Sequence, residues 1–232
     1  MIKAVNIDSV ISRELLEQKL TIPAGMDLPK VSTDGVFIMF HQKSYNSPAM
    51  VNPDKWKNHQ DIGEIADGVV VVDGGKILVV APAETSLHWS SAPVIGGGKT
   101  TTDRLTALDD WAGKANTAAQ ITHAECQGVG YAPGYCAQYS RANANGQGLT
   151  AGKWWLPSLG ELMMIYANMR KINHALSLIN GATLLSETWY WSSTEASASF
   201  AWYLYYNNGV AHYGIPKIEY RGKVRPVSAF IA

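Results

Sequence analysis

The segment from residue 196 to residue 216 carries six aromatic side chains and no charged one. Side chains alternate between the two faces of a β-strand, so Trp202 and Leu204 share one face. Burying that face exposes Tyr203 and Tyr205 on the other. Tyrosine offers a large, rigid contact area and a hydroxyl group at a low cost in conformational entropy, as it does in antibody loops. The segment therefore predicts a recognition surface; the alternative is a sheet edge with ordinary exposed tyrosines.

Charge and composition exclude several classes of protein. The 232 residues include 19 Lys plus Arg against 19 Asp plus Glu, and 47% are hydrophobic. The balanced charge argues against nucleic-acid binding, which depends on a basic excess, and the apolar content excludes a disordered chain. The apolar runs are far shorter than the roughly 18–20 residues that span a bilayer, so no membrane insertion is expected. Acidic residues near the N-terminus stand where a signal peptide has its apolar core, which predicts synthesis and initial retention in a cytoplasm.

Several short segments have the composition of β-strands. Residues 69–72 and 77–80 are β-branched runs joined by Asp-Gly-Gly-Lys, whose glycines supply the backbone freedom that a tight hairpin turn requires. Residues 35–40 also have the length and composition of a strand. Further strand candidates near the C-terminus are residues 188–193, 201–206 and 223–230. With 21 glycines and 10 prolines, the chain is expected to contain long loops between these strands.

Capping signals mark two helices. Asp103 can cap a helix in which apolar residues from Leu105 to Trp111 recur at three-residue spacing, which predicts one buried face. Residues 158–161, Ser-Leu-Gly-Glu, form a capping box before a run that keeps one helical face apolar. Gly181 can end this second helix.

Residues 1–60 have a different pattern of helix and loop signals from the rest of the chain. The spacing of apolar residues predicts a helix around residues 10–20, and prolines and a glycine follow it. We interpret residues 1–60 as a small attachment or oligomerisation region and residues 61–232 as the main domain. Within that domain, the glycine-rich residues 124–152 predict a long irregular loop, and such loops often have a function.

No arrangement of residues predicts catalysis or a cofactor. Residues 96–100, Gly-Gly-Gly-Lys-Thr, end like a phosphate-binding loop but lack its first glycine. His123, Cys126 and Cys136 could supply three metal ligands, whereas structural zinc takes four; two packed free thiols are expected instead of a metal site or a disulfide. The acidic pair at residues 109–110 is expected on the solvated surface. The sequence therefore predicts no catalytic residue, no metal and no cofactor.

Motifs in the C-terminal half resemble a known family. The motifs, in order, are Trp-Trp-Leu-Pro-Ser-Leu-Gly-Glu-Leu at 154–162, Tyr-Trp-Ser-Ser-Thr-Glu at 190–195, Ala-Trp at 201–202, Asn-Gly at 208–209 and Val-Arg-Pro-Val at 224–227. Over residues 61–232 this pattern resembles the C-type-lectin-fold proteins of the DUF1566 type, which include the variable proteins of diversity-generating retroelements. The resemblance implies an α+β fold, a C-type lectin-like domain with two helices, short antiparallel strands and long loops. The calcium-binding triplets of sugar-binding lectins are missing from the sequence, so the resemblance does not imply calcium-mediated sugar recognition.

The resemblance also implies roles for individual residues. In such variable proteins, the mutated asparagine codons never encode Trp, Lys, Glu, Gln or Met, and Trp202 is the one residue of these types in 196–216. The implied scaffold residues are Trp191, Ser192, Ser193, Thr194, Glu195, Trp202, Gly209, Lys217, Val224, Arg225 and Pro226. The implied variable, ligand-binding residues are Ala196, Ala198, Phe200, Tyr203, Tyr205, Ala211, His212, Tyr213 and Gly214.

Together these features predict a non-enzymatic receptor- or ligand-binding protein with a hypervariable surface. The expectation is a phage or prophage tail adhesin, diversified by a retroelement, made in the host cytoplasm and carried on the virion. Its expected partner is a protein or glycan receptor on a bacterial surface, and residues 1–60 are expected to build a homo-oligomer such as a trimer. One alternative is a bacterial surface or pilus-tip adhesin. Another is an enzyme like the formylglycine-generating enzymes, whose late cysteine pair has no counterpart after Cys136.

Overall fold

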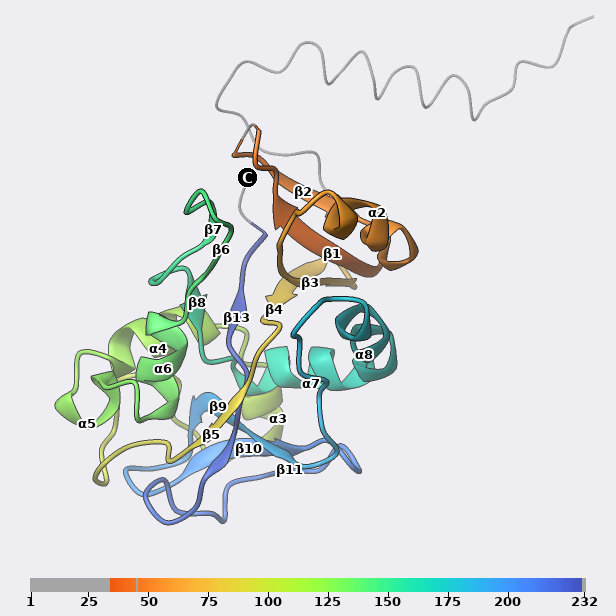
Figure 1. The fold of residues 1–232 in the computed structure, drawn as a ribbon. Helices are drawn as coiled ribbons and strands as arrows, with labels where there is room; N and C mark the ends of the chain where they lie inside the picture. The colour runs from red at the N-terminus through yellow and green to blue at the C-terminus, as the bar shows by residue number, and fades with distance from the viewer. Residues whose placement is uncertain (1–33, 45, 231–232) are drawn as a thin grey trace, which may run out of the picture. The chain divides into compact units, whose positions relative to one another are not determined.

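The computed structural model describes residues 34–44 and 46–230, which belong to one compact unit. The helix predicted around residues 10–20 lies outside the described residues. The described residues form runs of short α-helices and runs of mostly antiparallel strands, so the α+β class is confirmed (Figure 1). The C-type lectin-like assignment stays a prediction. None of the helices in the described ranges combines the length and the apolar composition needed to cross a membrane.

The larger sheet is antiparallel and has six strands in the order β2-β1-β3-β4-β13-β8. They are β1 (Gly35–His41), β2 (Pro48–Val51), β3 (Ala66–Asp73), β4 (Lys76–Val80), β8 (Trp154–Trp155) and β13 (Val227–Ser228). The predicted hairpin is confirmed, because β3 and β4 pair around Gly74 and Gly75, whose positive φ angles of 55° and 76° suit residues without a Cβ. Strand β1 pairs along β3. The boundary predicted at residue 60 therefore falls inside the compact unit, after two strands of its larger sheet.

The smaller sheet has five strands in the order β11-β10-β9-β12-β5. They are β5 (Thr85–Leu87), β9 (Trp189–Glu195), β10 (Ala201–Tyr205), β11 (Ala211–His212) and β12 (Gly222–Val224), and a separate hairpin pairs β6 (Arg141–Ala142) with β7 (Gly148–Leu149). The strand predicted at 223–230 is divided, with β12 in the smaller sheet and β13 in the larger one. Pro226 stands between them and has no N–H to donate to a ladder. The C-terminal chain thereby links the two sheets.

The helices are short. They are η1 (Pro53–Lys55), α2 (Trp56–Asp61), α3 (Arg104–Leu108), α4 (Gly113–Gln120), α5 (Ala124–Gln127), α6 (Ala132–Gln138), α7 (Leu159–Ala167) and α8 (Met169–Ser177). The capping box of α7 is confirmed: the Ser158 N–H donates to the Glu161 carboxylate at 2.9 Å, and the Glu161 N–H donates to Ser158 Oγ at 3.5 Å. The apolar run that follows forms two helices instead of one, because the chain leaves the helical conformation at Asn168.

Helix α3 differs from its prediction. Asp103 caps it as expected, accepting a hydrogen bond of 2.8 Å from the Thr106 N–H. The helix ends at Leu108, however, so the three-residue spacing does not continue along one helical face. Leu105 is 76% exposed and Trp111 is 37% exposed, while Ala107 is the residue that α3 buries.

Residues 124–152 contain α5, α6 and the β6–β7 hairpin, so the prediction of one irregular loop is wrong. Helix α6 has Pro133 in its first turn, where a missing N–H costs little. Cys126 in α5 and Cys136 in α6 are both buried and free. These helices escape prediction because each is short and the second contains Gly134.

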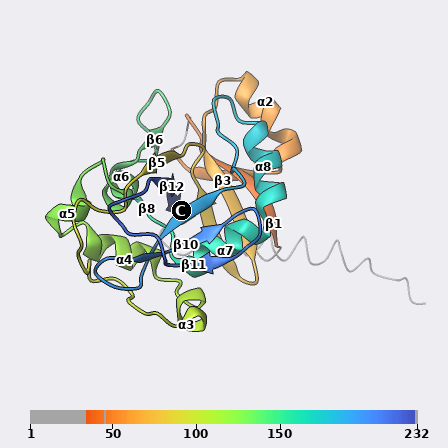
Figure 2. The same ribbon diagram turned by 90° about the horizontal axis from the view of Figure 1, so that it is seen from below.

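Two hydrophobic clusters hold the unit together. The first packs α7 and α8 against the larger sheet and includes Tyr190, Trp202 and Leu204 of the smaller sheet. The second lies on the other face of the smaller sheet and includes Trp89 and Tyr203. Helices α4, α5 and α6 gather on one side of the unit and α8 lies on the opposite side (Figure 1 and Figure 2). The smaller sheet is therefore covered on both faces over much of its area.

Candidate recognition surface

The register of β9, β10 and β11 places five ring side chains on one face of the smaller sheet. Tyr203 lies opposite Trp191 on β9 and opposite His212 on β11, while Tyr205 lies opposite Trp189. Neighbouring ring centroids in this set are 4.9–5.9 Å apart, within the range of favourable aromatic pairs. We call Trp189, Trp191, Tyr203, Tyr205 and His212 the aromatic row.

Tyr203 is the buried centre of the aromatic row, which corrects the prediction that it faces solvent. Trp202 and Leu204 are buried on the opposite face as expected, but Tyr203 is only 3% exposed itself. The reason is that the second hydrophobic cluster, which includes Trp89, covers this face of β10 as well. Burial raises the pKa of the Tyr203 hydroxyl to about 12. Tyr203 therefore supports its neighbours and offers a ligand little of its own surface.

The outer members of the row are accessible. His212 is exposed and Tyr205 is half-buried. The Gly214 N–H donates to His212 Nδ1 at 2.7 Å, and the Tyr203 hydroxyl lies 3.1 Å from the same nitrogen. Because a backbone N–H can only donate, Nδ1 is an acceptor, and the neutral imidazole carries its hydrogen on Nε2. The His212 ring is thereby held in one orientation at the edge of the sheet.

The nine residues predicted to be variable do not form one continuous exposed face. Buried among them are Ala196, Tyr203 and Ala211; Ala198, Phe200, Tyr205 and Tyr213 are half-buried; His212 and Gly214 are exposed. Tyr203, Tyr205 and His212 come together in the aromatic row. Phe200 and Tyr213 instead pack against the first hydrophobic cluster, where the Tyr213 ring lies 4.7 Å from that of Trp202.

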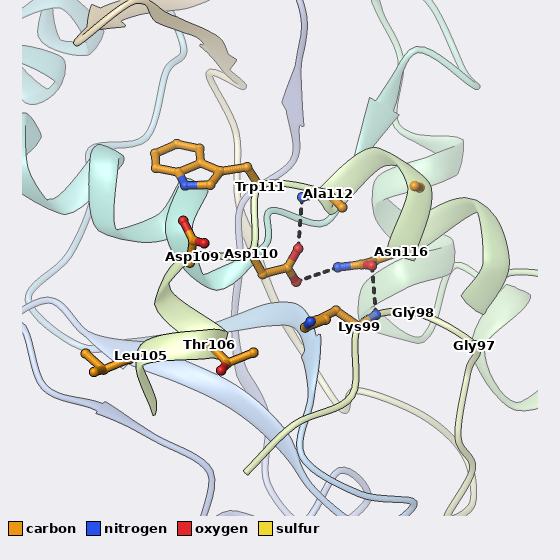
Figure 3. A pocket seen from close by; sticks show the side chains of 11 residues that line it. Gly97, Gly98, Lys99, Leu105, Thr106, Asp109, Asp110, Trp111, Ala112 and Asn116 are labelled. Carbon is orange, nitrogen blue, oxygen red and sulfur yellow. Dashed lines mark hydrogen bonds between the residues drawn. The ribbon is translucent and has the colours of Figure 1, made fainter. Parts of the chain in front are cut away.

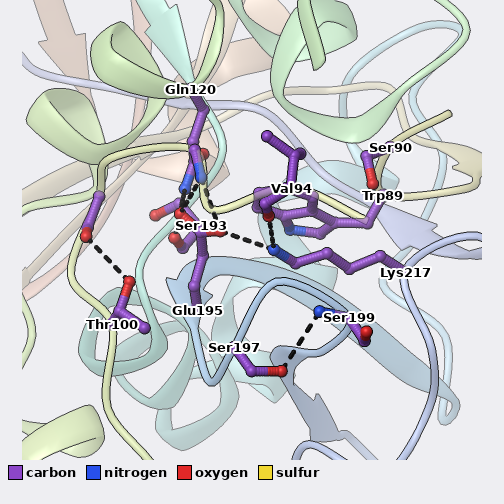
Figure 4. Close-up of polar contacts among 12 residues, drawn as sticks. Trp89, Ser90, Val94, Thr100, Gln120, Ser193, Glu195, Ser197, Ser199 and Lys217 are labelled. Atoms are coloured by element: carbon purple, nitrogen blue, oxygen red, sulfur yellow. Dashed lines mark hydrogen bonds and ion pairs between the residues drawn. The ribbon is translucent and has the colours of Figure 1, made fainter. Parts of the chain in front are cut away.

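A buried ion pair joins the two ends of residues 196–216. Lys217 Nζ lies 2.6 Å from Glu195 Oε2, and both side chains are 0% exposed (Figure 4). The ammonium group also donates to the Val94 carbonyl at 2.7 Å and lies 4.0 Å from the centre of the Trp89 ring. Glu195 accepts a further bond of 3.0 Å from the Gly96 N–H. Burial lowers the pKa of Lys217, and the Glu195 carboxylate opposes this shift by favouring the charged ammonium.

Backbone hydrogen bonds add to the ion pair at the base of the segment. The Val94 N–H donates to the Ala198 carbonyl at 2.9 Å, and the Lys217 N–H donates to the Ser199 carbonyl at 2.9 Å. The Ala196 N–H donates to the Phe200 carbonyl at 2.9 Å. Since these bonds use no side chain of residues 196–216, they are compatible with many side chains there.

Ten of the eleven residues implied to be scaffold are buried. Trp202 illustrates their role, because its indole N–H donates to the Thr101 carbonyl at 2.7 Å and its own carbonyl accepts from the Ser192 hydroxyl at 2.8 Å. Gly209 is half-buried, and its φ angle of 74° suits a residue without a side chain. Seven of the implied scaffold residues lie in β9, β10 or β12 of the smaller sheet, and the other four, Gly209, Lys217, Arg225 and Pro226, lie in the segments that follow these strands.

Three framework residues have no signal in the sequence. Glu84 pairs with Arg225 at 2.6 Å and accepts from the Tyr190 hydroxyl at 2.7 Å. The Gln120 amide donates to the Ser193 carbonyl at 2.6 Å. Asp110, which was expected on the solvated surface, is buried and accepts from the Thr194 hydroxyl at 2.7 Å. Each of these contacts joins residues distant in the sequence, so no local pattern reveals it.

The described residues bring together little of the chemistry that a metal or nucleophile requires. Between residues 34 and 230, with residue 45 left aside, no three or more His, Cys, Asp or Glu side chains are grouped to hold a metal ion. Burial raises the pKa of Cys126 to about 12 and that of Cys136 well above its ordinary value. Both thiols are therefore protonated at neutral pH and are poor nucleophiles.

Comparisons with known proteins give one structural similarity. No protein-family profile matches the sequence, and no curated protein matches it. A fimbrial protein from Bacteroides ovatus ATCC 8483 is similar in structure, with a TM-score of 0.44 and 14% sequence identity, over 89% of this chain and 46% of the fimbrial protein. The chain thus spans less than half of the length of that protein.

Proposed function

We propose that this protein is a non-enzymatic ligand-binding protein of the adhesin type. We place its binding surface at the accessible end of the aromatic row and the adjoining tip of residues 196–216. The contact residues are Trp189, Tyr205, His212 and Tyr213. The observation that carries the proposal is the Glu195–Lys217 pair, which fixes the base of the segment independently of the side chains that the segment presents.

The physical properties of this surface suit recognition. Aromatic side chains give a large contact area and lose little conformational entropy on binding. The buried rings of Tyr203 and Trp191 lie beside the accessible rings and hold them in place, so less order has to be created when a partner binds. Residues 196–216 bear no charged side chain. The surface therefore suits an uncharged region of a glycan or of a protein receptor.

Two finer proposals concern the origin of the surface. We propose a C-type lectin-like fold for the domain. We also propose that the protein is carried either on a bacterial surface or pilus tip, or on a phage tail, where a retroelement diversifies it. The neighbouring DNA distinguishes these two locations, because a reverse transcriptase gene with an imperfect repeat of the 3′ end of this gene supports diversification on a phage tail. In that case, differences between isolates are expected at Tyr205, His212 and Tyr213 and not at the buried Tyr203.

Cell binding tests the proposed function directly. Fluorescently labelled protein is incubated with intact bacteria of the source and related strains, and the bound fraction is measured by flow cytometry. We expect binding by the unaltered protein and at least a tenfold loss in the triple variant Tyr205→Ala, His212→Ala, Tyr213→Ala. Ile62→Ala, an exposed apolar substitution at the end of α2, serves as the control and should not alter binding.

Thermal unfolding of the triple variant shows whether a loss of binding reflects a loss of fold. Lost binding by a variant that is still folded at the temperature of the binding assay supports the proposal. Unreduced binding by the triple variant contradicts it, as does the failure of the unaltered protein to bind any of the bacteria.

A further inference from the structure

A hollow with a volume of about 870 Å³ lies between residues 97–99 and helices α3 and α4 (Figure 3). Ligand pockets in proteins typically measure about 300–1,000 Å³, so a small molecule fits. None of the residues that line it belongs to the aromatic row. The hollow is therefore a second candidate site with its own chemistry.

A buried hydrogen-bond network forms the floor of this hollow. Asp110 accepts from the Ala112 N–H at 2.9 Å, from the Asn116 amide at 2.8 Å and from the Thr194 hydroxyl at 2.7 Å. The Asn116 side chain in turn accepts from the Lys99 N–H at 2.9 Å. These bonds connect residues 97–99 to the start of α4, so the walls are fixed before any ligand arrives.

The rim combines apolar and polar side chains. Trp111 and Leu105 are the apolar residues that α3 and its C-terminal turn leave exposed. The Lys76 ammonium lies 4.9 Å from the centre of the Trp111 ring and helps to fix its orientation. Asp109, Lys99 and Thr106 supply a carboxylate, an ammonium and a hydroxyl group. Within the part of the chain that the structure describes, neither Asp109 nor Lys99 is in an ion pair.

We propose that this hollow binds a short neutral oligosaccharide. The C–H faces of a sugar ring are apolar and pack on indole and leucyl side chains such as Trp111 and Leu105. Its hydroxyl groups both donate and accept, and so match the acceptor Asp109 and the donor Lys99 at the same time. The carboxylates of Asp109 and Asp110 balance the ammonium groups of Lys99 and Lys76 in charge. This balance favours a ligand without net charge over an anion such as a nucleotide.

The test uses the full chain and an array of short neutral oligosaccharides built from hexoses and N-acetylhexosamines. We expect the unaltered protein to bind a subset of the array. Isothermal titration with the sugars of that subset should show at least tenfold weaker binding for Trp111→Ala and for Asp109→Asn. Trp111→Phe keeps an aromatic face and should retain most of the affinity.

The triple variant of the proposed binding surface distinguishes the two sites. If Tyr205→Ala, His212→Ala, Tyr213→Ala keeps the sugar binding that Trp111→Ala loses, the sugar occupies the hollow. The inference is overturned if the array binds no protein, if Trp111→Ala and Asp109→Asn bind normally, or if the triple variant alone loses sugar binding. The last result would place the sugar on the proposed binding surface and would leave the proposed function standing. Unfolding temperatures confirm that each variant is folded.

Discussion

Glu195 and Lys217 are separated by 22 positions in the sequence, yet their carboxylate and ammonium groups lie 2.6 Å apart without exposure to solvent. A buried ion pair gains stability only when hydrogen bonds satisfy its remaining atoms, and here the Val94 carbonyl and the Gly96 N–H do so. The pair marks the boundary between a segment that presents side chains and a framework that holds it.

Lys217→Met is expected to lower the free energy of unfolding by about 3–5 kcal/mol, because it leaves the Glu195 carboxylate buried without its partner. The double variant Glu195→Gln, Lys217→Met removes both charges and should be more stable than Lys217→Met alone. Urea unfolding of the two variants and the unaltered protein measures both effects. A change below 1 kcal/mol for Lys217→Met would show that the ion pair does not hold the segment.

Tyr203→Ala is expected to destabilise the protein by about 3–5 kcal/mol, since it empties a space inside the second hydrophobic cluster. Tyr205→Ala, in contrast, removes a half-buried ring from the same strand and should cost about 1 kcal/mol. The two single variants are matched in chemistry and differ in burial. Equal losses in chemical unfolding would contradict the assignment of Tyr203 to the framework.

Glu161→Gln is expected to change how stability depends on pH. Burial raises the pKa of Glu161 from its ordinary value of 4.5 to about 7, so the folded state holds this proton more tightly than the unfolded state does. This contribution to the free energy of unfolding is complete below pH 4.5, falls as the pH rises towards 7, and is lost above it. The uncharged glutamine keeps an acceptor for the Ser158 N–H.

The free energy of unfolding of Glu161→Gln should therefore exceed that of the unaltered protein by on the order of 1–3 kcal/mol at pH 8, and by almost nothing at pH 4.5. Urea unfolding at these two pH values measures the difference. Asp67, whose pKa burial raises to about 6, has the same sign and stays in both proteins, which makes the comparison specific to Glu161. An identical pH dependence in the two proteins would show that Glu161 is charged in the fold at neutral pH.

The thiols of Cys126 and Cys136 are expected to resist a thiol reagent at pH 8 in the native protein. Both thiols are buried, so the reagent cannot reach them easily. Burial also raises their pKa values, so only a small fraction of each thiol is in the reactive thiolate form. In guanidinium chloride, both thiols should react at once. Rapid reaction of the native protein would show that α5 and α6 open far more readily than their packing indicates.

Local signals in the sequence predict local structure correctly. The Asp103 cap, the Ser158–Glu161 capping box and the turn at Gly74 and Gly75 are all present, because each depends on residues within one turn of the chain. The three-residue spacing from Leu105 to Trp111 fails because the helix is too short to carry it. Periodicity predicts a face only if the helix continues.

Burial in the recognition segment was harder to predict, because it depends on distant parts of the chain. Alternation along β10 predicts correctly that Trp202 is buried, but Tyr203 is buried too, in a cluster that includes Trp89 and Cys126, both distant from it in the sequence. Asp110 likewise contacts Thr194, 84 positions further along. Alternation along a strand assigns its residues to two faces, but it does not reveal whether other parts of the chain cover each face.

Strand β10 takes part in both hydrophobic clusters, with Trp202 and Leu204 in the first and Ala201 and Tyr203 in the second. Neither cluster can come apart without removing support from this strand, so the two are expected to melt as one cooperative unit. Amide protons between residues 201 and 205 should then be among the slowest to exchange with solvent, even though β11, at the edge of the sheet beside them, is only two residues long.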